Sequence, residues 1–319
     1  MIVTLTANPS VDRTIELAGE LRRGEVLRAV TVRSGPGGKG VNVARALAGA
    51  GAPTVAVLPA RGDDGMLAAL REQAVAFHAV DVPHPVRVNV TVVEPDGTTT
   101  KLNEAGAPLA DDVLDALVAA VLDEAAGARW AVLSGSLPPG VPDDWYVGLI
   151  AALRARGCAV AVDTSGEPLK AVATAAVLPD LLKPNAEELA ELTGLDVAKL
   201  ESDAECVADA ARALIARGAG AVLATLGRHG AVLVDGDGAA YFGQAGAVVP
   251  INTVGAGDAT LSGYLLADLA GAGPADRLRQ AVAFGAAAVQ LAGSAMPRPG
   301  DLRPDGVSVV ALAPRPVAS

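Results

Sequence analysis

The residue best suited to move a proton, Asp258, stands just before an apolar run. It follows glycine, alanine and glycine at 255–257, and leucines at four-residue spacing in 260–269 predict a helix. Backbone N–H groups at a helix N-terminus attract anions such as phosphate. A carboxylate placed there is suited to accept a proton from a nucleophile beside that phosphate. An ordinary helix cap would also explain Asp258, and this stretch alone favours the cap.

A second glycine-rich segment, residues 35–40, contains one cation, Lys39, and precedes an apolar helical pattern. Its glycines match a dinucleotide fingerprint, with Asp63 about twenty residues further on, but the match is weak because Pro36 lies inside it. A P-loop is excluded because Gly40, rather than serine or threonine, follows Lys39. We expect a flexible loop that a substrate approaches closely, with Lys39 as a point charge for a phosphate.

Two strands of alternating polarity, at 86–94 and 98–104, flank the turn Pro95-Asp96-Gly97. A three-residue loop with Gly97 in the left-handed conformation places residue 91 opposite 101 and residue 89 opposite 103. One face of this hairpin then carries two cations and two amides, namely Arg87, Asn89, Lys101 and Asn103. A solvated face is the usual explanation of such polarity, and this face is also suited to hold a sugar phosphate.

The rest of the chain predicts the fold that must position these groups. Apolar strands at 2–6, 54–59, 131–133, 158–162 and 221–225 alternate with helical patterns. The alternation predicts an α/β fold with a mostly parallel sheet and helices on both faces. Ligands collect at the carboxyl ends of such strands, where Asp12 follows the first strand. Residues 10–33 and 87–104 do not fit the alternation, and we expect them to form a small β lobe over the cleft.

The composition excludes several classes of function. The 319 residues carry a formal net charge of −11, which argues against nucleic acid or an anionic membrane as the main partner. Two cysteines and three histidines make a Cys/His metal site improbable. No window has the length of a membrane span, and the N-terminus has no basic leader. We therefore expect a soluble cytosolic protein.

Three motifs together resemble the ribokinase-like, phosphofructokinase-B family of sugar kinases over nearly the whole chain. They are Gly-Gly-Lys-Gly-Val-Asn-Val-Ala-Arg at 37–45, Asn-Thr-Val-Gly-Ala-Gly-Asp-Ala at 252–259, and Lys183-Pro184-Asn185 with Glu188. Asn185 and Glu188 also have capping-box spacing. The resemblance implies a three-layer α/β/α sandwich with a β-sheet lid. It further implies a single kinase domain over 1–319, with the lid formed by about 10–33 and 87–104.

Within the family, segments 6–12, 100–106 and 134–140 are most similar to the branch that phosphorylates sugar phosphates. The resemblance implies ATP-dependent conversion of fructose 1-phosphate to fructose 1,6-bisphosphate. A tagatose-6-phosphate kinase and a minor 6-phosphofructokinase are the alternatives. In having a lysine at position 39, this chain resembles the enzymes that phosphorylate fructose 1-phosphate and tagatose 6-phosphate. The minor 6-phosphofructokinase has glycine at that position and uses a lysine nearer the lid, where this chain has Glu25.

The resemblance also implies a role for each matched residue. The catalytic group comprises Asp258 as the base for the sugar hydroxyl, with Gly255, Ala256 and Gly257 donating N–H groups to the transferred phosphoryl. The substrate group comprises Asp12, Gly38, Lys39, Asn42, Arg87, Lys101, Asn103 and Ser136. The ATP group comprises Lys183, Asn185, Thr225, Gly227, Gly230, Val254 and Gly257, and Asn185 with Glu188 would arrange Mg²⁺ through water. A homodimer through the lid sheet is expected.

Three other functions fit parts of the sequence. A kinase of nucleosides or unphosphorylated sugars would share the fold, but a neutral sugar needs no pair of lid cations. A nicotinamide-dependent oxidoreductase would rest on the weak glycine fingerprint. A catalytically inactive sugar-phosphate sensor is disfavoured because Asp258 and Glu188 are both present.

Overall fold

The computed structural model describes residues 1–313, and within them the main sheet has ten strands. Their order is β14-β13-β12-β11-β10-β9-β8-β1-β4-β5. The bounds are β1 (Ile2–Leu5), β4 (Thr54–Pro59), β5 (Ala76–Val80), β8 (Trp130–Ser134), β9 (Ala159–Asp163), β10 (Leu181–Leu182), β11 (Ala221–Thr225), β12 (Ala231–Asp235), β13 (Ala240–Ala245) and β14 (Val307–Leu312). The strands from β11 to β5 in this list are parallel to their neighbours. The remaining strands, β12, β13 and β14, extend the sheet from β11 by antiparallel pairing. The predicted mostly parallel sheet is confirmed.

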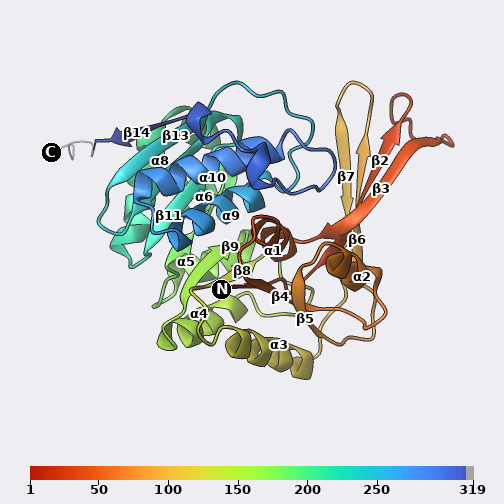
Figure 1. Cartoon of the computed structure of the whole chain (residues 1–319), viewed down its shortest axis with the longest axis horizontal. Helices are drawn as coiled ribbons and strands as arrows, with labels where there is room; N and C mark the ends of the chain where they lie inside the picture. Colours follow the sequence, from red (N-terminus) through yellow and green to blue (C-terminus); the bar gives the residue numbers. More distant parts are fainter. Residues whose placement is uncertain (314–319) are drawn as a thin grey trace.

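Helices cover both faces of this sheet, and Figure 1 shows the resulting layers. They are α1 (Lys39–Gly49), α2 (Gly65–Glu72), α3 (Asp111–Glu124), α4 (Trp145–Ala155), α5 (Gly166–Thr174), α6 (Ala186–Thr193), α7 (Val197–Ser202), α8 (Ala204–Ala216), α9 (Ala256–Leu269) and α10 (Pro274–Ala288), with short 3₁₀ segments η1 (Gly227–His229), η2 (Pro299–Asp301) and η3 (Pro304–Gly306). None of the helices within residues 1–313 combines the length and the apolar composition that crossing a membrane requires.

Successive residues of the central strands are buried on opposite faces of the sheet. Ile2 of β1 packs in the core beneath α1, α9 and α10, whereas its neighbour Val3 packs in the core beneath α3, α4, α6 and α8. Because both faces are covered, the strands are almost continuously apolar. The parallel arrangement brings the carboxyl ends of β1, β8, β9 and β11 to one edge of the sheet, which is where such folds bind ligands.

Four further strands form a second sheet, the small sheet, which projects from the body (Figure 1). Its order is β3 (Ala29–Gly37), β2 (Ser10–Leu17), β6 (Arg87–Val93) and β7 (Thr99–Asn103). Thr91 lies opposite Lys101 and Asn89 opposite Asn103, so the predicted hairpin register is confirmed. Gly97 has a φ of +89°, the left-handed conformation that the three-residue loop requires.

The glycine-rich segment at 35–40 is not the flexible loop that the sequence led us to expect. Residues 35–37 complete β3 and pair with residues 10–12 of β2, and Gly38, with a φ of +101°, separates this strand from α1. A Cβ at position 37 would lie 2.3 Å from the carboxylate of Asp12, so any other residue there would displace that carboxylate. Since β3 belongs to the small sheet rather than to the main sheet, the segment also lacks the structural context of a dinucleotide fingerprint.

Candidate active site

Asp258 lies in the first turn of α9 but does not cap it. The N-cap is Gly255, with a φ of +78° and no side-chain bond, so the cap that the local sequence favoured is wrong. The Asp258 side chain is 6% exposed, and its Oδ2 accepts a 2.9 Å hydrogen bond from Nδ2 of Asn42 on α1. Burial, reinforced by the negative charge of Asp163, raises the pKa of Asp258 to about 6. The group is thus a carboxylate that can exchange a proton near neutral pH.

Two lysines and three carboxylates gather beside the start of α9, and we name Lys39, Asp163, Lys183, Glu188 and Asp258 the ionic cluster. Asp163 ends β9, and its oxygens lie 2.6 Å from Nζ of Lys39 and 3.0 Å from Nζ of Lys183. Glu188 Oε1 lies 3.9 Å from Nζ of Lys39. A Cβ built on Gly257 would be 3.4 Å from Nζ of Lys183, which places that ammonium group at the helix N-terminus. Cations and free N–H groups at one point favour a bound phosphate.

The charges of the cluster are mutually dependent. Burial acts to lower the pKa of Lys39, but the carboxylates of Asp163, Glu188 and Asp258 hold it above its ordinary value. Burial acts to raise the pKa of Asp163, but the two ammonium groups hold it below its ordinary value. Burial raises the pKa of Glu188, and the same lysines partly offset that rise. Asp163 is therefore an anion held between two cations.

Asn185 and Glu188 form the predicted capping box of α6. Oδ1 of Asn185 accepts a 2.7 Å bond from the Glu188 N–H, and Oε2 of Glu188 accepts a 2.8 Å bond from the Asn185 N–H. Residues 1–313 contain no group of three or more His, Cys, Asp or Glu side chains that could hold a metal ion. With Glu188 Oε2 bound to the backbone, the donor set suits a Mg²⁺ ion held mainly by water and phosphate oxygens.

A pocket lies between the small sheet and the body, and we call it the sheet pocket. Asp12, Asn89, Lys101 and Asn103 line it from the small sheet, faced by Asn252, Val254 and Ser294 from the body. Oδ1 of Asp12 accepts hydrogen bonds from Oγ of Ser10 at 2.8 Å and from Nδ2 of Asn89 at 3.2 Å. The structure thus brings Asn89, Lys101 and Asn103 of the predicted polar hairpin face together with Asp12 and Val254.

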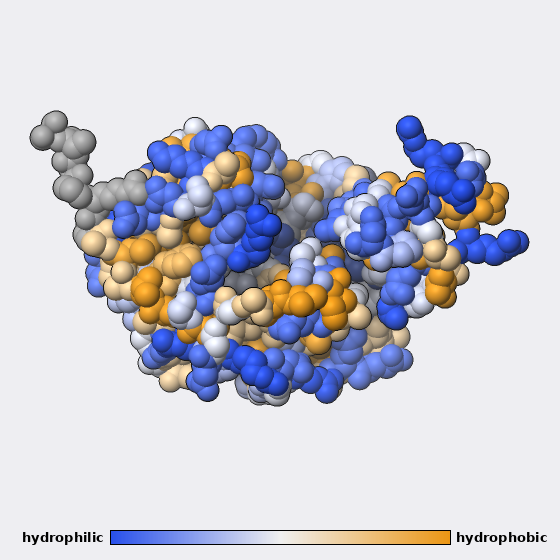
Figure 2. Space-filling model, turned by 90° about the horizontal axis from the view of Figure 1, so that it is seen from above, coloured by the Kyte–Doolittle hydropathy of each residue, from blue (hydrophilic) through white to orange (hydrophobic). Residues whose placement is uncertain are grey.

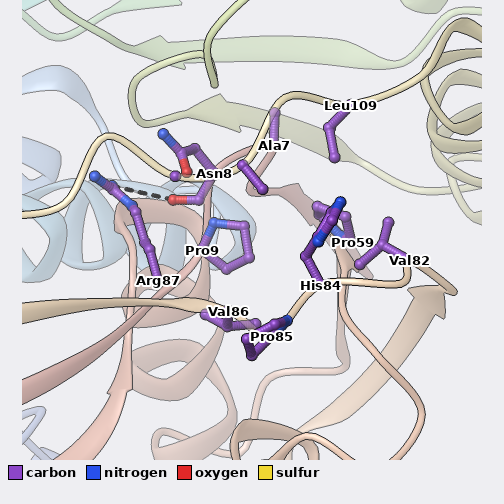
Figure 3. Close-up of a pocket in the computed structure, with 12 residues that line it drawn as sticks. Ala7, Asn8, Pro9, Pro59, Val82, His84, Pro85, Val86, Arg87 and Leu109 are labelled. Atoms are coloured by element: carbon purple, nitrogen blue, oxygen red, sulfur yellow. Dashed lines mark hydrogen bonds between the residues drawn. The ribbon is translucent and has the colours of Figure 1, made fainter.

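Arg87 and Ser136 were also predicted to bind substrate. In the structure the Arg87 side chain is bonded to backbone carbonyls and Ser136 to the side-chain amide of Asn8. The Arg87 guanidinium donates to the carbonyl oxygens of Glu104 at 2.6 Å and Asn8 at 3.1 Å. Figure 3 shows this side chain pointing toward the Asn8 carbonyl, beside a small pocket that His84 also lines. Nδ2 of Asn8 lies 3.4 Å from Oγ of Ser136. Arg87 therefore fixes the loop after β1, and the structure does not place it among the residues that line the sheet pocket.

Three of the residues predicted to bind the nucleotide, Thr225, Gly227 and Gly230, lie at or just after the end of β11. Two others lie elsewhere, since Val254 lines the sheet pocket and Gly257 is in the first turn of α9. Thr225 ends β11 and bridges to Asn185. Gly227 begins η1, and Gly230, with a φ of +101°, is the residue that follows it as the C-cap. A Cβ on Gly230 would lie 2.2 Å from the carbonyl oxygen of Gly243, so glycine is required there. These backbone segments lie next to the capping box, whereas Lys101 belongs to the sheet pocket.

Comparison with known proteins decides the family. The model of the pfkB family carbohydrate kinases matches residues 5–300. The chain belongs to the pfkB family. A 1-phosphofructokinase from Rhodobacter capsulatus is 39% identical over 305 residues, which cover 93% of each protein. The ATP-dependent 6-phosphofructokinase isozyme 2 of Escherichia coli is 33% identical over 296 residues, covering 90% of this chain and 92% of that protein.

A solved structure of a pfkB relative confirms the fold. The Escherichia coli phosphofructokinase-2 in complex with substrates and products has a TM-score of 0.87 at 32% identity, covering 94% of this chain and 96% of that chain. The family resemblance read from the motifs and the expected sandwich with an additional small sheet are both confirmed.

The residue missing from the predicted pfkB site is Asp163. It is fully buried and contacts two lysines that the motifs had already identified, yet it lies outside all three motifs. The sequence does contain a feature that indicates Asp163 as a site residue, because it ends a buried parallel strand. Asp12 was predicted as a site residue for a similar reason, since it follows the end of the first strand.

Proposed function

We propose that this pfkB kinase transfers the γ-phosphoryl group of ATP to a hydroxyl of a sugar phosphate, with fructose 1-phosphate as substrate and fructose 1,6-bisphosphate as product. The observation that carries the proposal is the buried carboxylate of Asp258 at the start of α9, beside the ammonium groups of Lys39 and Lys183. The relatives named 1-phosphofructokinase support this substrate. Tagatose 6-phosphate and, given the Escherichia coli relative, fructose 6-phosphate are the alternatives.

In this proposal Asp258 accepts the proton of the attacking sugar hydroxyl, and Asn42 donates a hydrogen bond that favours the ionised base. Lys183 and the N–H groups of Gly255, Ala256 and Gly257 stabilise the negative charge on the transferred group, since such transfers are promoted mainly by positioning and electrostatics. Mg²⁺, arranged through Asn185 and Glu188, would neutralise the phosphate oxygens when bound. Closure of the small sheet over the sugar would exclude water.

The first experiment is ADP release with MgATP and each of fructose 1-phosphate, tagatose 6-phosphate, fructose 6-phosphate, ribose and adenosine. We expect the largest kcat/KM with fructose 1-phosphate. A larger value with another phosphosugar would keep the mechanism and change the substrate, whereas turnover with ribose or adenosine alone would contradict the proposal.

Lys101 is expected to recognise the phosphate that the sugar already carries. Lys101 lines the sheet pocket together with Asp12 and Asn103. A charge-assisted contact of about 1.5–3 kcal/mol is lost in Lys101→Met, so KM for fructose 1-phosphate should rise roughly 10–100-fold while KM for MgATP changes little. The control is Lys170→Met, which removes an exposed lysine paired with Glu167. Equal effects of Lys101→Met on both KM values would contradict a phosphosugar role.

The pH dependence of kcat should report the base. Asp258 must be ionised to act, and its pKa of about 6 follows from burial first and the charge of Asp163 second. Activity is therefore present above that value and should fall tenfold for each unit of pH below it. The phosphate of the free substrate also titrates at about 6. Its titration affects kcat/KM, so kcat at saturating substrate is the quantity measured. A constant kcat down to pH about 5 would contradict ionisation of Asp258 as a requirement.

We also propose a homodimer that pairs the outer faces of two small sheets. Val30, Val32 and Leu102, exposed to 66%, 54% and 61%, lie on the face opposite Lys101, and Figure 2 shows apolar residues on the projecting lobe. An apolar face of this kind favours self-association. Sedimentation velocity should give twice the chain mass for the wild type and a single mass for Val32→Glu, with Val249→Glu, an exposed valine elsewhere, as the control. A monomeric wild type would contradict the dimer.

A further inference from the structure

Arg45 joins the base of the proposed reaction to strand β3 of the small sheet and to the body-side wall of the sheet pocket. Its Nη1 lies 2.9 Å from the carbonyl oxygen of Pro36 on β3 and 2.9 Å from that of Ser294, which lines the pocket on the body side. The same nitrogen lies 3.1 Å from Oδ1 of Asn42, one helical turn earlier on α1, so its two hydrogens are shared among three acceptors. Nε donates to Oε1 of Gln73 at 2.7 Å. The guanidinium is thus held in place from several directions.

The contact with Asn42 determines how its amide is turned. A guanidinium can only donate hydrogen bonds, so the atom of Asn42 that faces Arg45 must be the carbonyl oxygen. The NH₂ group then points the other way, and Nδ2 of the buried Asn42 donates to Oδ2 of Asp258 at 2.9 Å. An amide turned the opposite way would present an oxygen to the carboxylate, which is repulsive when Asp258 is ionised.

We propose that Arg45 is a positioning residue for phosphoryl transfer, because it fixes the Asn42 amide in the orientation that donates to Asp258. The inference rests on the proposed role of Asp258 as the base. The other charged groups that act on Asp258 are Lys39 on α1, Asp163 at the end of β9 and Lys183 after β10. Each of these acts on Asp258 through charge, whereas Asn42 is the residue that donates a hydrogen bond to it. The contacts of Arg45 thus connect β3 of the small sheet and Ser294, which lines the sheet pocket, through Asn42 to the base.

The test compares Arg45→Met, Arg45→Lys and Gln73→Ala. In Arg45→Met the amide can rotate, so kcat should fall roughly tenfold, the effect of about one net hydrogen bond, with little change in KM for MgATP. The pKa of Asp258, followed in the free protein by ¹³C NMR of its carboxyl group, should rise because the ionised form loses a donor. Arg45→Lys keeps a cationic donor and should recover part of both effects. Gln73→Ala removes a partner of Nε without touching Nη1, so kcat and the acid dissociation constant of Asp258 should each stay within twofold of the wild type.

A double-variant cycle decides whether Arg45 acts through Asn42. If it does, Arg45→Met combined with Asn42→Ala should lose no more kcat than Asn42→Ala alone. Additive losses, or a lower kcat in Arg45→Met with an unchanged pKa of Asp258, would overturn the proposal. Should Arg45→Met not fold, the same comparisons with Arg45→Lys still decide it. Full turnover by Asp258→Asn would instead reject Asp258 as the base, and the NMR titration would still test the orientation of Asn42.

Discussion

Asp258→Asn is expected to lower kcat by roughly 10²–10⁴-fold, the usual contribution of a positioned proton acceptor. Asparagine has nearly the shape of aspartate and keeps an oxygen that can accept the 2.9 Å hydrogen bond from Asn42. It cannot accept a proton from the sugar hydroxyl. The two KM values should therefore change much less than kcat, because the charge and shape of the substrate sites are retained elsewhere in the ionic cluster and the sheet pocket.

The same variant should not be less stable at neutral pH, which separates a chemical effect from unfolding. The folded pKa of Asp258, about 6, is above the value near 3.9 expected for an unfolded aspartate. Between those two values the native protein keeps a proton that the unfolded chain has lost, so this group's contribution to stability falls as pH rises through that window. Removing the titratable group removes this cost.

Two results would contradict the role of Asp258. One is a kcat of Asp258→Asn within tenfold of the wild type, and the other is a lowered Tm that accounts for the loss of activity. The control is Asp276→Asn, at an exposed carboxylate paired with Arg279.

Asp163→Ala is expected to lower the free energy of unfolding by about 3–5 kcal/mol, the range for removing one partner of a buried ion pair. Asp163 is fully buried, and Lys183 is 3% exposed, so the alanine variant leaves an ammonium group without its anion. Lys39 is 34% exposed, and water can solvate it in part, so most of the cost comes from Lys183. Urea unfolding at neutral pH measures the difference.

Two further variants show whether the cost arises from the uncompensated charge. Asp163→Ala combined with Lys183→Met removes both partners, and the pair should be less destabilised than the sum of the single variants. Glu16→Ala breaks the exposed pair with Arg33 and should cost about 0–1 kcal/mol. If Asp163→Ala costs no more than Glu16→Ala, Asp163 is not the anion that balances the cluster.

The features that the sequence predicts well are local. The alternation of apolar strands and helices predicts the parallel sheet, and the polarity of the hairpin with Gly97 at its turn predicts the pairing of Thr91 with Lys101. The capping box follows from the three-residue spacing of Asn185 and Glu188. Each of these rests on neighbours within a few residues or on one regular period.

The features that the sequence does not reveal depend on contacts between distant segments. Lys39 and Asp163 are separated by 124 residues, and their ion pair exists because α1 and the end of β9 meet at one edge of the sheet. Residues 35–37 look like a loop in sequence, and their pairing with β2 makes them a strand. Asp258 looks like a cap, and tertiary contact with Asn42 gives its side chain another partner. Strand β14 joins the sheet by pairing with β13, a contact between segments far apart in the chain.

The most direct test of the account is the ratio of kcat/KM for fructose 1-phosphate to that for fructose, measured with MgATP on the wild type and on Lys101→Met. The two sugars differ by the phosphate that the sheet pocket is proposed to bind. We predict a ratio of at least about 10² for the wild type, because two charge-assisted hydrogen bonds to a phosphate contribute about 3 kcal/mol or more, and a smaller ratio for Lys101→Met. A ratio near one for the wild type would mean that the enzyme does not recognise a sugar phosphate, and the proposed substrate class would be wrong.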